Sequence, residues 1–314
     1  MNRYIEFLLG MGYSSSSIRQ HVRYIEVFRG WLNENSISAE QCKYPELIHF
    51  IDDAMRYYNS RKNPKSTINR MLVSIAMYYD HLITDNPEIK NPAKNVRIKN
   101  PIQRMAHNLL DKKELDTLYQ SLESNNVRNV RNKVILGFLV FQGLSTGELH
   151  RLRLMDVRLR KGTLFISEST CGTWKKGPTV RELNLEALQI IDLIDYIDNY
   201  RTRIICDHYR HLPGRKPQKR IADPKTDQLL LSVAGCQDLK NSLHHMFRNL
   251  SQINPRVRNA TQIRRSVISN WLRRYDLRTV QYMAGHRYVS STEYYKQVNI
   301  EELKRKIDEF HPLN

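Results

Sequence analysis

Apolar residues recur at helical spacing over most of the chain, and short strand-like runs occur only in its middle. A serine cluster at residues 14–17 precedes one such stripe and can cap a helix. A second stripe follows residues 64–67. The two stripes consist of Ile18, Val22, Ile25 and Leu32, and of Ile68, Leu72, Ile75, Tyr79 and Leu82. They predict a small helical domain over residues 1–96.

The remainder of the chain mixes helical stripes with short strand-like runs. Asp111 and Glu114 have the spacing of a capping box at a helix start. Runs at residues 163–166 and 180–185 are typical of two strands joined by a long turn, and the apolar run 229–233 predicts another short strand. The basic stretch 97–107 has no apolar period, which indicates a linker. We predict a mainly α protein with a small β-sheet, whose α+β second domain spans residues 108–314.

The charge of the chain points to its partner. Its 314 residues include 50 Lys and Arg against 32 Asp and Glu, a formal net charge of +18, which favours a polyanion. The basic residues are spread over the whole length, so we expect nucleic acid rather than a membrane surface. The 4 cysteines are far apart and form no Cys-x-x-Cys pair, so neither zinc nor disulfides are predicted. With no evident signal peptide or membrane span, we expect a cytoplasmic, nucleoid-associated protein.

Candidate chemistry gathers near the C-terminus, between residues 261 and 297. Arg264 lies at the border of a predicted buried helix face, where its guanidinium can be held still to donate to two phosphate oxygens. Gly285 ends a second short helix and would project His286 from the helix end. Tyr295 follows His286 by nine residues, and its phenol can become a nucleophile if nearby cations stabilise the phenolate.

This segment resembles the C-terminal signature of the tyrosine recombinases, the phage integrase family. The family motif reads His-x-x-Arg, then Leu-Gly-His, then Thr-Thr-x-x-Tyr, and the corresponding text here is TQIR, MAGH and SSTEYY, ending on Tyr295. The helical N-terminal domain is similar to the family's core-binding, SAM-like domain, including an Asn-Pro-Ala at residues 91–93. The resemblance covers nearly the whole chain.

Two positions depart from the family pattern. The segment GLSTGEL resembles the family's Thr-Gly-Leu-Arg-x-x-Glu-Leu, but its first catalytic arginine falls on Ser145, while Glu148 and Leu149 are retained. Thr261 stands where the first histidine of His-x-x-Arg is expected, and a threonine can still hydrogen-bond a phosphate oxygen. Arg151 and Arg153 lie one to two turns beyond Ser145, but their geometry does not favour reaching inward to replace the lost arginine.

The resemblance also implies a lysine and several DNA contacts. Lys176 lies five residues before Arg181, similar to the family's catalytic lysine in a strand-turn-strand tongue, and Lys175 competes for that role. A lysine there can protonate the departing 5′ oxygen. The predicted DNA-contacting residues are Arg61, Lys62, Lys65, Asn69, Lys175, Arg265 and Arg287.

The family implies a site-specific recombinase of a mobile element, acting in DNA integration or excision. Tyr295 would form a 3′-phosphotyrosyl bond, Arg264 and His286 would stabilise the transition state, and no metal or nucleotide cofactor would be needed. Strand exchange would occur in a homo-tetramer on two sites or in a hetero-assembly with related recombinases, with an apolar helix face at residues 300–310 docking on a neighbour. Two alternatives remain: a catalytically impaired DNA-binding homologue, favoured by Ser145, and a type IB topoisomerase, which shares the chemistry but acts as a monomer.

Overall fold

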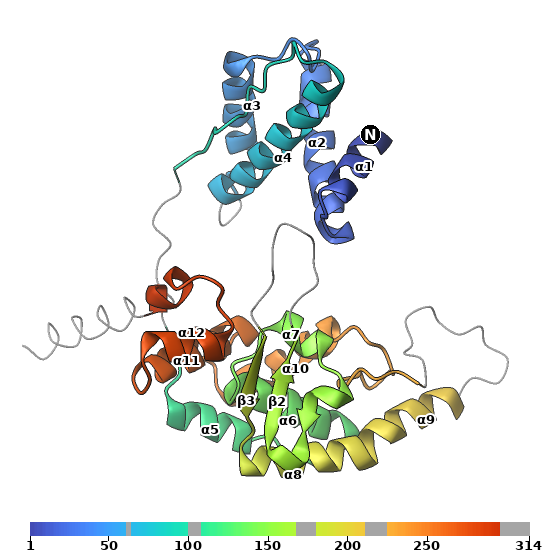
Figure 1. The fold of residues 1–314 in the computed structure, drawn as a ribbon, viewed down its shortest axis with the longest axis vertical. Helices are drawn as coiled ribbons and strands as arrows, with labels where there is room; N and C mark the ends of the chain where they lie inside the picture. The colour runs from blue at the N-terminus through green and yellow to red at the C-terminus, as the bar shows by residue number, and fades with distance from the viewer. Residues whose placement is uncertain (61–63, 100–107, 168–179, 211–224, 296–314) are drawn as a thin grey trace, which may run out of the picture. The chain divides into compact units, whose positions relative to one another are not determined.

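The computed structural model describes residues 1–60, 64–99, 108–167, 180–210 and 225–295. Within these ranges the chain forms two compact units, which divide near residue 105 (Figure 1). No helix in the described ranges combines the length and the apolar character needed to cross a bilayer.

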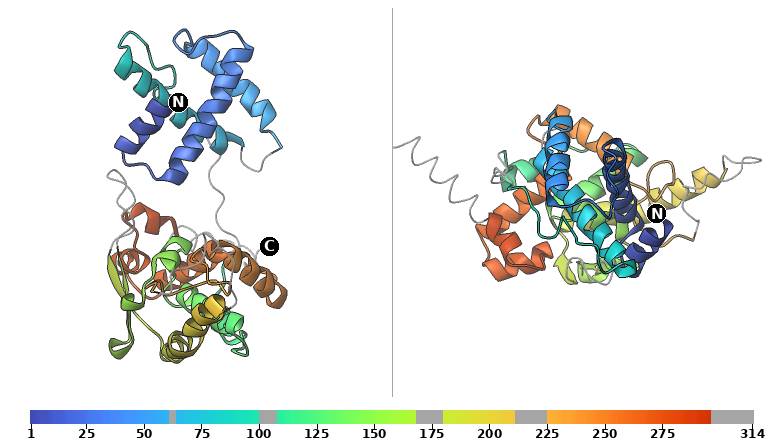
Figure 2. Two further views of the ribbon diagram at one scale, coloured as in Figure 1. Left: turned by 90° about the vertical axis from the view of Figure 1, so that its right-hand side faces the viewer. Right: turned by 90° about the horizontal axis from the view of Figure 1, so that it is seen from above.

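The N-terminal unit is a bundle of four helices (Figures 1 and 2). The helices are α1 (Asn2–Gly10), α2 (Ser15–Glu34), α3 (Tyr44–Tyr57) and α4 (Pro64–Asp85). Ser14 is the N-cap of α2, and its hydroxyl accepts a hydrogen bond from the Ser17 amide at 3.3 Å, which confirms the predicted cap. Phe28 packs edge-on against Phe50 and Tyr79, so that α2, α3 and α4 share one apolar core.

The second unit is built around helix α6 (Val127–Val140), whose residues 134–140 are all buried. Helix α5 (Lys112–Gln120) packs beside it and begins with the predicted capping box of Asp111 and Glu114. The other long helices are α8 (Ala187–Asp195), α9 (Thr202–Arg210), α10 (Lys240–Ile253), α11 (Ala260–Leu272) and α12 (Leu277–Ala284). A short helix, α7 (Thr146–Arg151), follows α6 after a left-handed Gly143.

A small antiparallel sheet completes this unit, in the order β1-β2-β3. The strands are β1 (Val157–Arg158), β2 (Thr163–Ile166) and β3 (Arg181–Asn184), so both predicted strands are confirmed. In β3 the residues alternate, with Arg181 and Leu183 buried and Glu182 and Asn184 exposed. The Glu182 amide donates to the Tyr282 hydroxyl at 3.0 Å, which ties β3 to α12.

The predicted strand at residues 229–233 is wrong. Leu229, Leu230 and Leu231 are fully buried, but their backbone bonds go to a loop and a side chain instead of a neighbouring strand. The Leu229 amide donates to the Leu152 carbonyl, and the Leu231 amide to the hydroxyl of Tyr196, which lies in a π-helical turn (Tyr196–Arg201) between α8 and α9. A short apolar run indicates that a segment is buried, but it does not specify which groups form hydrogen bonds with the backbone N–H and C=O groups of that segment.

Candidate active site

Arg264 is held rigidly on α11. Asn259 caps this helix, and the apolar residues Ile263 and Val267 anchor it in the core, so that the Arg264 side chain is 14% exposed. Its guanidinium donates to the Gly143 and Ala284 carbonyls, both at 2.5 Å, and approaches Glu148 Oε2 at 3.4 Å. Burial lowers the pKa of Arg264, while the Glu148 carboxylate acts in the opposite direction. A guanidinium fixed in this way needs little reorganisation to meet an anion.

Glu148 is the acceptor that organises the site. Ser145, the N-cap of α7, donates to Glu148 Oε2 from its amide at 2.8 Å and from its hydroxyl at 2.7 Å. Burial alone would raise the pKa of Glu148, but Arg181 and Arg264, with the Ser145 amide, hold it below its usual value. The serine at the departed family position therefore anchors the carboxylate that fixes Arg264.

Arg181 is a member of this site that the sequence reasoning missed. Its side chain is fully buried, donating from Nη1 to Glu148 Oε1 at 2.7 Å and from Nε to the Met283 carbonyl at 2.9 Å. The signal was present in the strand pattern, because the two-residue period of β3 places Arg181 on the same face as the apolar Leu183. Two guanidinium groups thus share one carboxylate.

His286 and Tyr295 lie against these cations. As predicted, Gly285 ends α12 in the left-handed conformation, with φ of 65°, and His286 follows it. His286 Nδ1 is 2.9 Å from the hydroxyl of the buried Thr292, and its ring is parallel to that of Tyr295, with centroids 6.0 Å apart. Burial and the Arg264 and Arg181 cations lower the pKa of His286 to about 4, so the imidazole is neutral near pH 7.

Arg151, Arg153 and Thr261 lie outside this cluster. Arg151 is exposed at the end of α7, and Arg153 pairs with Asp227 at 3.4 Å on the surface. Thr261 is exposed in the first turn of α11. Among the described residues, the arginine that joins Arg264 at Glu148 is therefore Arg181 of the sheet. Neither Arg151 nor Arg153 reaches Glu148.

Comparison with known proteins places the chain. Residues 108–302 match the phage integrase family, and residues 1–86 match the family's N-terminal SAM-like domain. The chain belongs to the phage integrase family. It is 24% identical over 314 residues to the tyrosine recombinase XerD of Rickettsia conorii, covering 99% of this chain and 98% of that protein.

Solved structures show the same fold. The XerH site-specific recombinase in a post-cleavage complex with a palindromic difH substrate has a TM-score of 0.67 and 17% identity, over 92% of this chain and 78% of that one. The Tn1549 transposon integrase with circular intermediate DNA has a TM-score of 0.64 and 14% identity, over 96% and 98%. The predicted fold class, mainly α with a small sheet and a SAM-like N-terminal domain, is confirmed for this phage integrase family member.

The residues predicted to contact DNA fall into three groups. Lys65 and Arg287 are exposed and Arg265 is half-buried. The Asn69 side chain is already engaged, because its amide group donates to the Ile98 carbonyl and accepts from the Ile98 amide, both at 2.8 Å. Arg61, Lys62, Lys175, Lys176 and the helix predicted at residues 300–310 lie outside the described residues.

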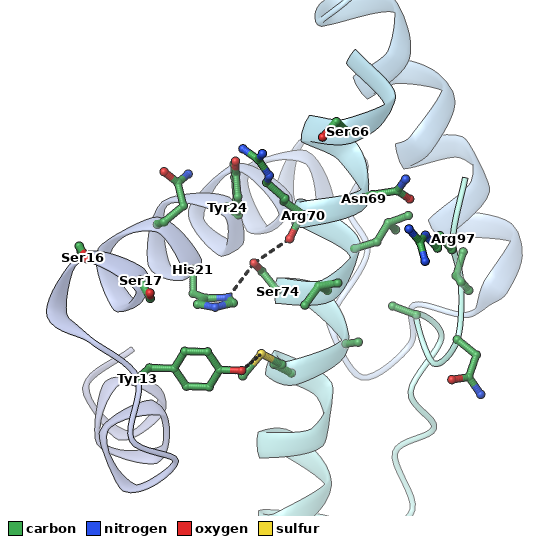
Figure 3. A pocket seen from close by; sticks show the side chains of 18 residues that line it. Tyr13, Ser16, Ser17, His21, Tyr24, Ser66, Asn69, Arg70, Ser74 and Arg97 are labelled. Atoms are coloured by element: carbon green, nitrogen blue, oxygen red, sulfur yellow. Dashed lines mark hydrogen bonds between the residues drawn. The ribbon is translucent and has the colours of Figure 1, made fainter. Parts of the chain in front are cut away.

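A groove of about 950 Å³, lined by both apolar and polar side chains, runs along α2 and α4 in the N-terminal unit. Figure 3 shows Ser17, His21 and Tyr24 of α2 facing Arg70 and Ser74 of α4. His21 Nδ1 is 2.8 Å from the Ser74 hydroxyl, and the exposed Arg97 joins the lining from the segment after α4. Hydroxyls, ring nitrogens and guanidinium groups are donors that suit phosphate and base edges.

Proposed function

We propose that this chain is a site-specific DNA recombinase that cuts and rejoins duplex DNA through a phosphotyrosyl bond at Tyr295. The observation that carries the proposal is the meeting of Tyr295 with a neutral His286 beside the buried, fixed guanidinium of Arg264. Such preorganised donors stabilise the charge that develops on a phosphate during displacement. Membership of the phage integrase family supports the same reaction.

The reaction is a transfer between two oxygens. The Tyr295 hydroxyl gives up its proton to solvent as its oxygen forms a bond to phosphorus. The bond from phosphorus to the 5′ oxygen breaks, and Lys176 gives that oxygen a proton, which the lysine regains from solvent. Arg264 and His286 hold the non-bridging oxygens of the phosphate. The phosphotyrosyl bond keeps the energy of the broken phosphodiester, so rejoining needs no nucleotide cofactor, and the cationic side chains do the work that a metal would otherwise do.

The partner in this proposal is duplex DNA at the ends of a mobile element, within the cytoplasm. The groove along α2 and α4 and the exposed Lys65 and Arg287 supply backbone contacts, while Asn69 holds the segment at Ile98. The XerH and Tn1549 integrase structures were solved with DNA, and a lambda integrase was solved as a dimer on a core site. We assign strand exchange to a tetramer on two sites, made of this chain alone or with a related recombinase.

The test is covalent trapping on nicked duplexes that span the ends of the DNA element encoding this chain. Wild type is compared with Tyr295→Phe, and the matched control is Tyr294→Phe, because Tyr294 is the adjacent ring, 5.6 Å away and edge-on. We expect an adduct that survives a denaturing gel with wild type and Tyr294→Phe, and none with Tyr295→Phe.

Other outcomes would change the assignment. An adduct that persists in Tyr295→Phe would reject Tyr295 as the nucleophile. Salt-sensitive binding without any adduct, on duplexes that a related active recombinase cleaves, would leave a DNA-binding homologue that works beside an active partner, as the Ser145 departure suggests. Relaxation of supercoiled DNA by isolated monomers would instead indicate a type IB topoisomerase.

A further inference from the structure

Arg181 is an unusual residue for the edge of a small sheet. Its side chain has no exposed surface, and a buried charge is costly unless it is paired and hydrogen-bonded. Two of its three nitrogens are satisfied, by Glu148 and by the Met283 carbonyl. The third, Nη2, is buried without a hydrogen-bond partner among the described residues. A buried guanidinium with a spare donor beside the proposed site is more than a packing element.

The fold makes room for this guanidinium at one glycine. A Cβ on Gly285 would overlap Arg181 Nη1, whereas a Cβ on Gly137 or Gly143 would meet its nearest neighbour at 3.1 or 3.2 Å. Arg181 therefore lies directly against the backbone that carries His286, and its bond to the Met283 carbonyl fixes the last turn of α12. Figure 1 shows β3 alongside α12, and the bond between Glu182 and Tyr282 joins the same two elements.

The Glu148 carboxylate connects Arg181 to Arg264. Oε1 accepts from Arg181 at 2.7 Å, while Oε2 faces Arg264 at 3.4 Å and accepts from Ser145. One negative charge is thereby held between two positive charges, so the cluster of these three side chains keeps a net charge of about +1. The position that carries an arginine in the resembled family motif holds Ser145 here, and the second cation of this cluster is Arg181 of the sheet.

We infer that Arg181 is a positioning residue for DNA cleavage, which orients Glu148 and Arg264 and supplies the second buried positive charge that Ser145 lacks. This inference rests on the proposed recombinase function. Arg181 acts by holding Glu148, by fixing the end of α12 and by the effect of its positive charge on His286, without touching the DNA. Its loss should therefore slow the chemical step much more than it weakens DNA binding.

The experiment uses the full chain with Arg181→Met, which keeps an apolar stem but removes the charge and the donors. We expect the rate of adduct formation at saturating DNA to fall roughly a hundredfold, the effect of a small misplacement at a reacting centre, with unchanged affinity for DNA. The pKa of His286, followed by NMR without DNA, should rise because a nearby cation is gone. The matched control is Arg158→Met, on β1, whose guanidinium pairs with Glu182 at 3.0 Å and is half-exposed. It should change neither quantity.

A second variant keeps the inference testable if Arg181→Met does not fold. Arg181→Lys retains the charge but replaces the planar guanidinium, which donates to Glu148 and Met283 from separate nitrogens, with a single nitrogen. The His286 pKa should therefore stay low while cleavage falls about tenfold. Cleavage at the wild-type rate in either Arg181 variant, or an unchanged His286 pKa in Arg181→Met, would overturn the inference. If wild type forms no adduct, the recombinase proposal fails, and the His286 pKa still decides whether Arg181 acts on the site.

Discussion

At the scale of single residues, Glu148 determines the arrangement of the site. Its two oxygens accept from Ser145, Arg181 and Arg264, and its side chain is 1% exposed. Removing one charged partner of such a buried group leaves the remaining charge buried without a counter-charge. The free energy of unfolding then falls by about 3–5 kcal/mol. The serine contributes a neutral donor, so its loss should be milder than the loss of either arginine.

Ser145→Ala tests the contribution of that hydroxyl. The variant loses the N-cap of α7 and one hydrogen bond to Glu148, and we expect about 1 kcal/mol less stability in chemical denaturation, with slower adduct formation. Ser14→Ala is the matched control, because Ser14 caps α2 in the N-terminal unit. It should lose a similar amount of stability and keep the wild-type cleavage rate. Equal cleavage rates in the two variants would argue against a role for Ser145 beyond capping.

His286 predicts how stability depends on pH. Its pKa in the folded chain, about 4, is below the usual value of 6.5, so between these values the unfolded chain binds the proton more readily. Stability should therefore be fully present above about pH 6.5 and fall as the pH drops toward 4. His286→Gln should flatten this part of the profile, measured by chemical denaturation at several pH values. An unchanged slope in this variant would mean that His286 is not the group responsible.

The candidate residues near one chain end were predicted from their order and spacing, which resemble the family signature. Arg264, Gly285, His286 and Tyr295 occur within 32 residues, so helix periodicity and a glycine stop already bring them together. Arg181 was missed because its partners, Glu148 and Met283, are distant in sequence and join it only when β3 lies beside α7 and α12. The engagement of Asn69 by the Ile98 backbone was hidden for the same reason.

At the scale of elements, the junction of β3 with the end of α12 controls where His286 points. Helix caps and strand alternation were predictable because both depend on neighbouring residues, as the caps at Ser14 and Asp111 confirm. The run at residues 229–233 was not, since its backbone partners come from residues 152 and 196. For a segment whose backbone partners are distant in sequence, the sequence predicts that the segment is buried but not which secondary structure it forms.

Gly285→Ala tests that junction against a matched glycine. Gly285 and Gly162 have nearly equal φ values, 65° and 63°, so alanine should cost about 1–2 kcal/mol of backbone strain at either position. At Gly162 the new methyl group would meet only Ile190 Cδ1 at 3.7 Å, whereas at Gly285 it would overlap Arg181. We expect Gly285→Ala to be clearly less stable than Gly162→Ala in thermal melting and to lose cleavage. Similar melting temperatures for the two variants would show that Arg181 moves aside at little cost.

At the scale of the whole molecule, the net charge of +18 dominates the encounter with DNA. Each phosphate contact releases bound counterions from the duplex, so affinity should fall steeply with salt. The charge is distributed over both units, and the groove along α2 and α4 presents Arg70 and Arg97. Affinity and cleavage are therefore separable properties, one spread over the surface and the other confined to the site.

Arg70→Gln and Arg97→Gln test whether the groove contacts the DNA backbone. Each should weaken binding on any sequence and reduce the slope of log affinity against log salt by about one. Arg56→Gln is the control, because Arg56 lies on α3, pairs with Asp53 at 3.6 Å and is not part of the groove. Binding by fluorescence anisotropy at several salt concentrations gives the slopes. If Arg56→Gln reduces the slope of log affinity against log salt as much as the groove variants do, the effect comes from the overall charge of the chain and not from contacts in the groove.

The pairing of two guanidinium groups with one carboxylate also has a thermodynamic consequence for the unbound protein. Arg181 and Arg264 repel each other, and the Glu148 carboxylate between them offsets only one of the two positive charges. A bound anion would offset the other. By linkage, a ligand that binds only the folded chain stabilises it, by about 2.7 kcal/mol at a hundred times its dissociation constant. The free recombinase should accordingly melt at a lower temperature than its DNA complex, and a phosphate-like oxyanion such as vanadate should recover part of the difference. If the site binds phosphate as proposed, the uncompensated charge that attracts the anion also lowers the stability of the empty protein.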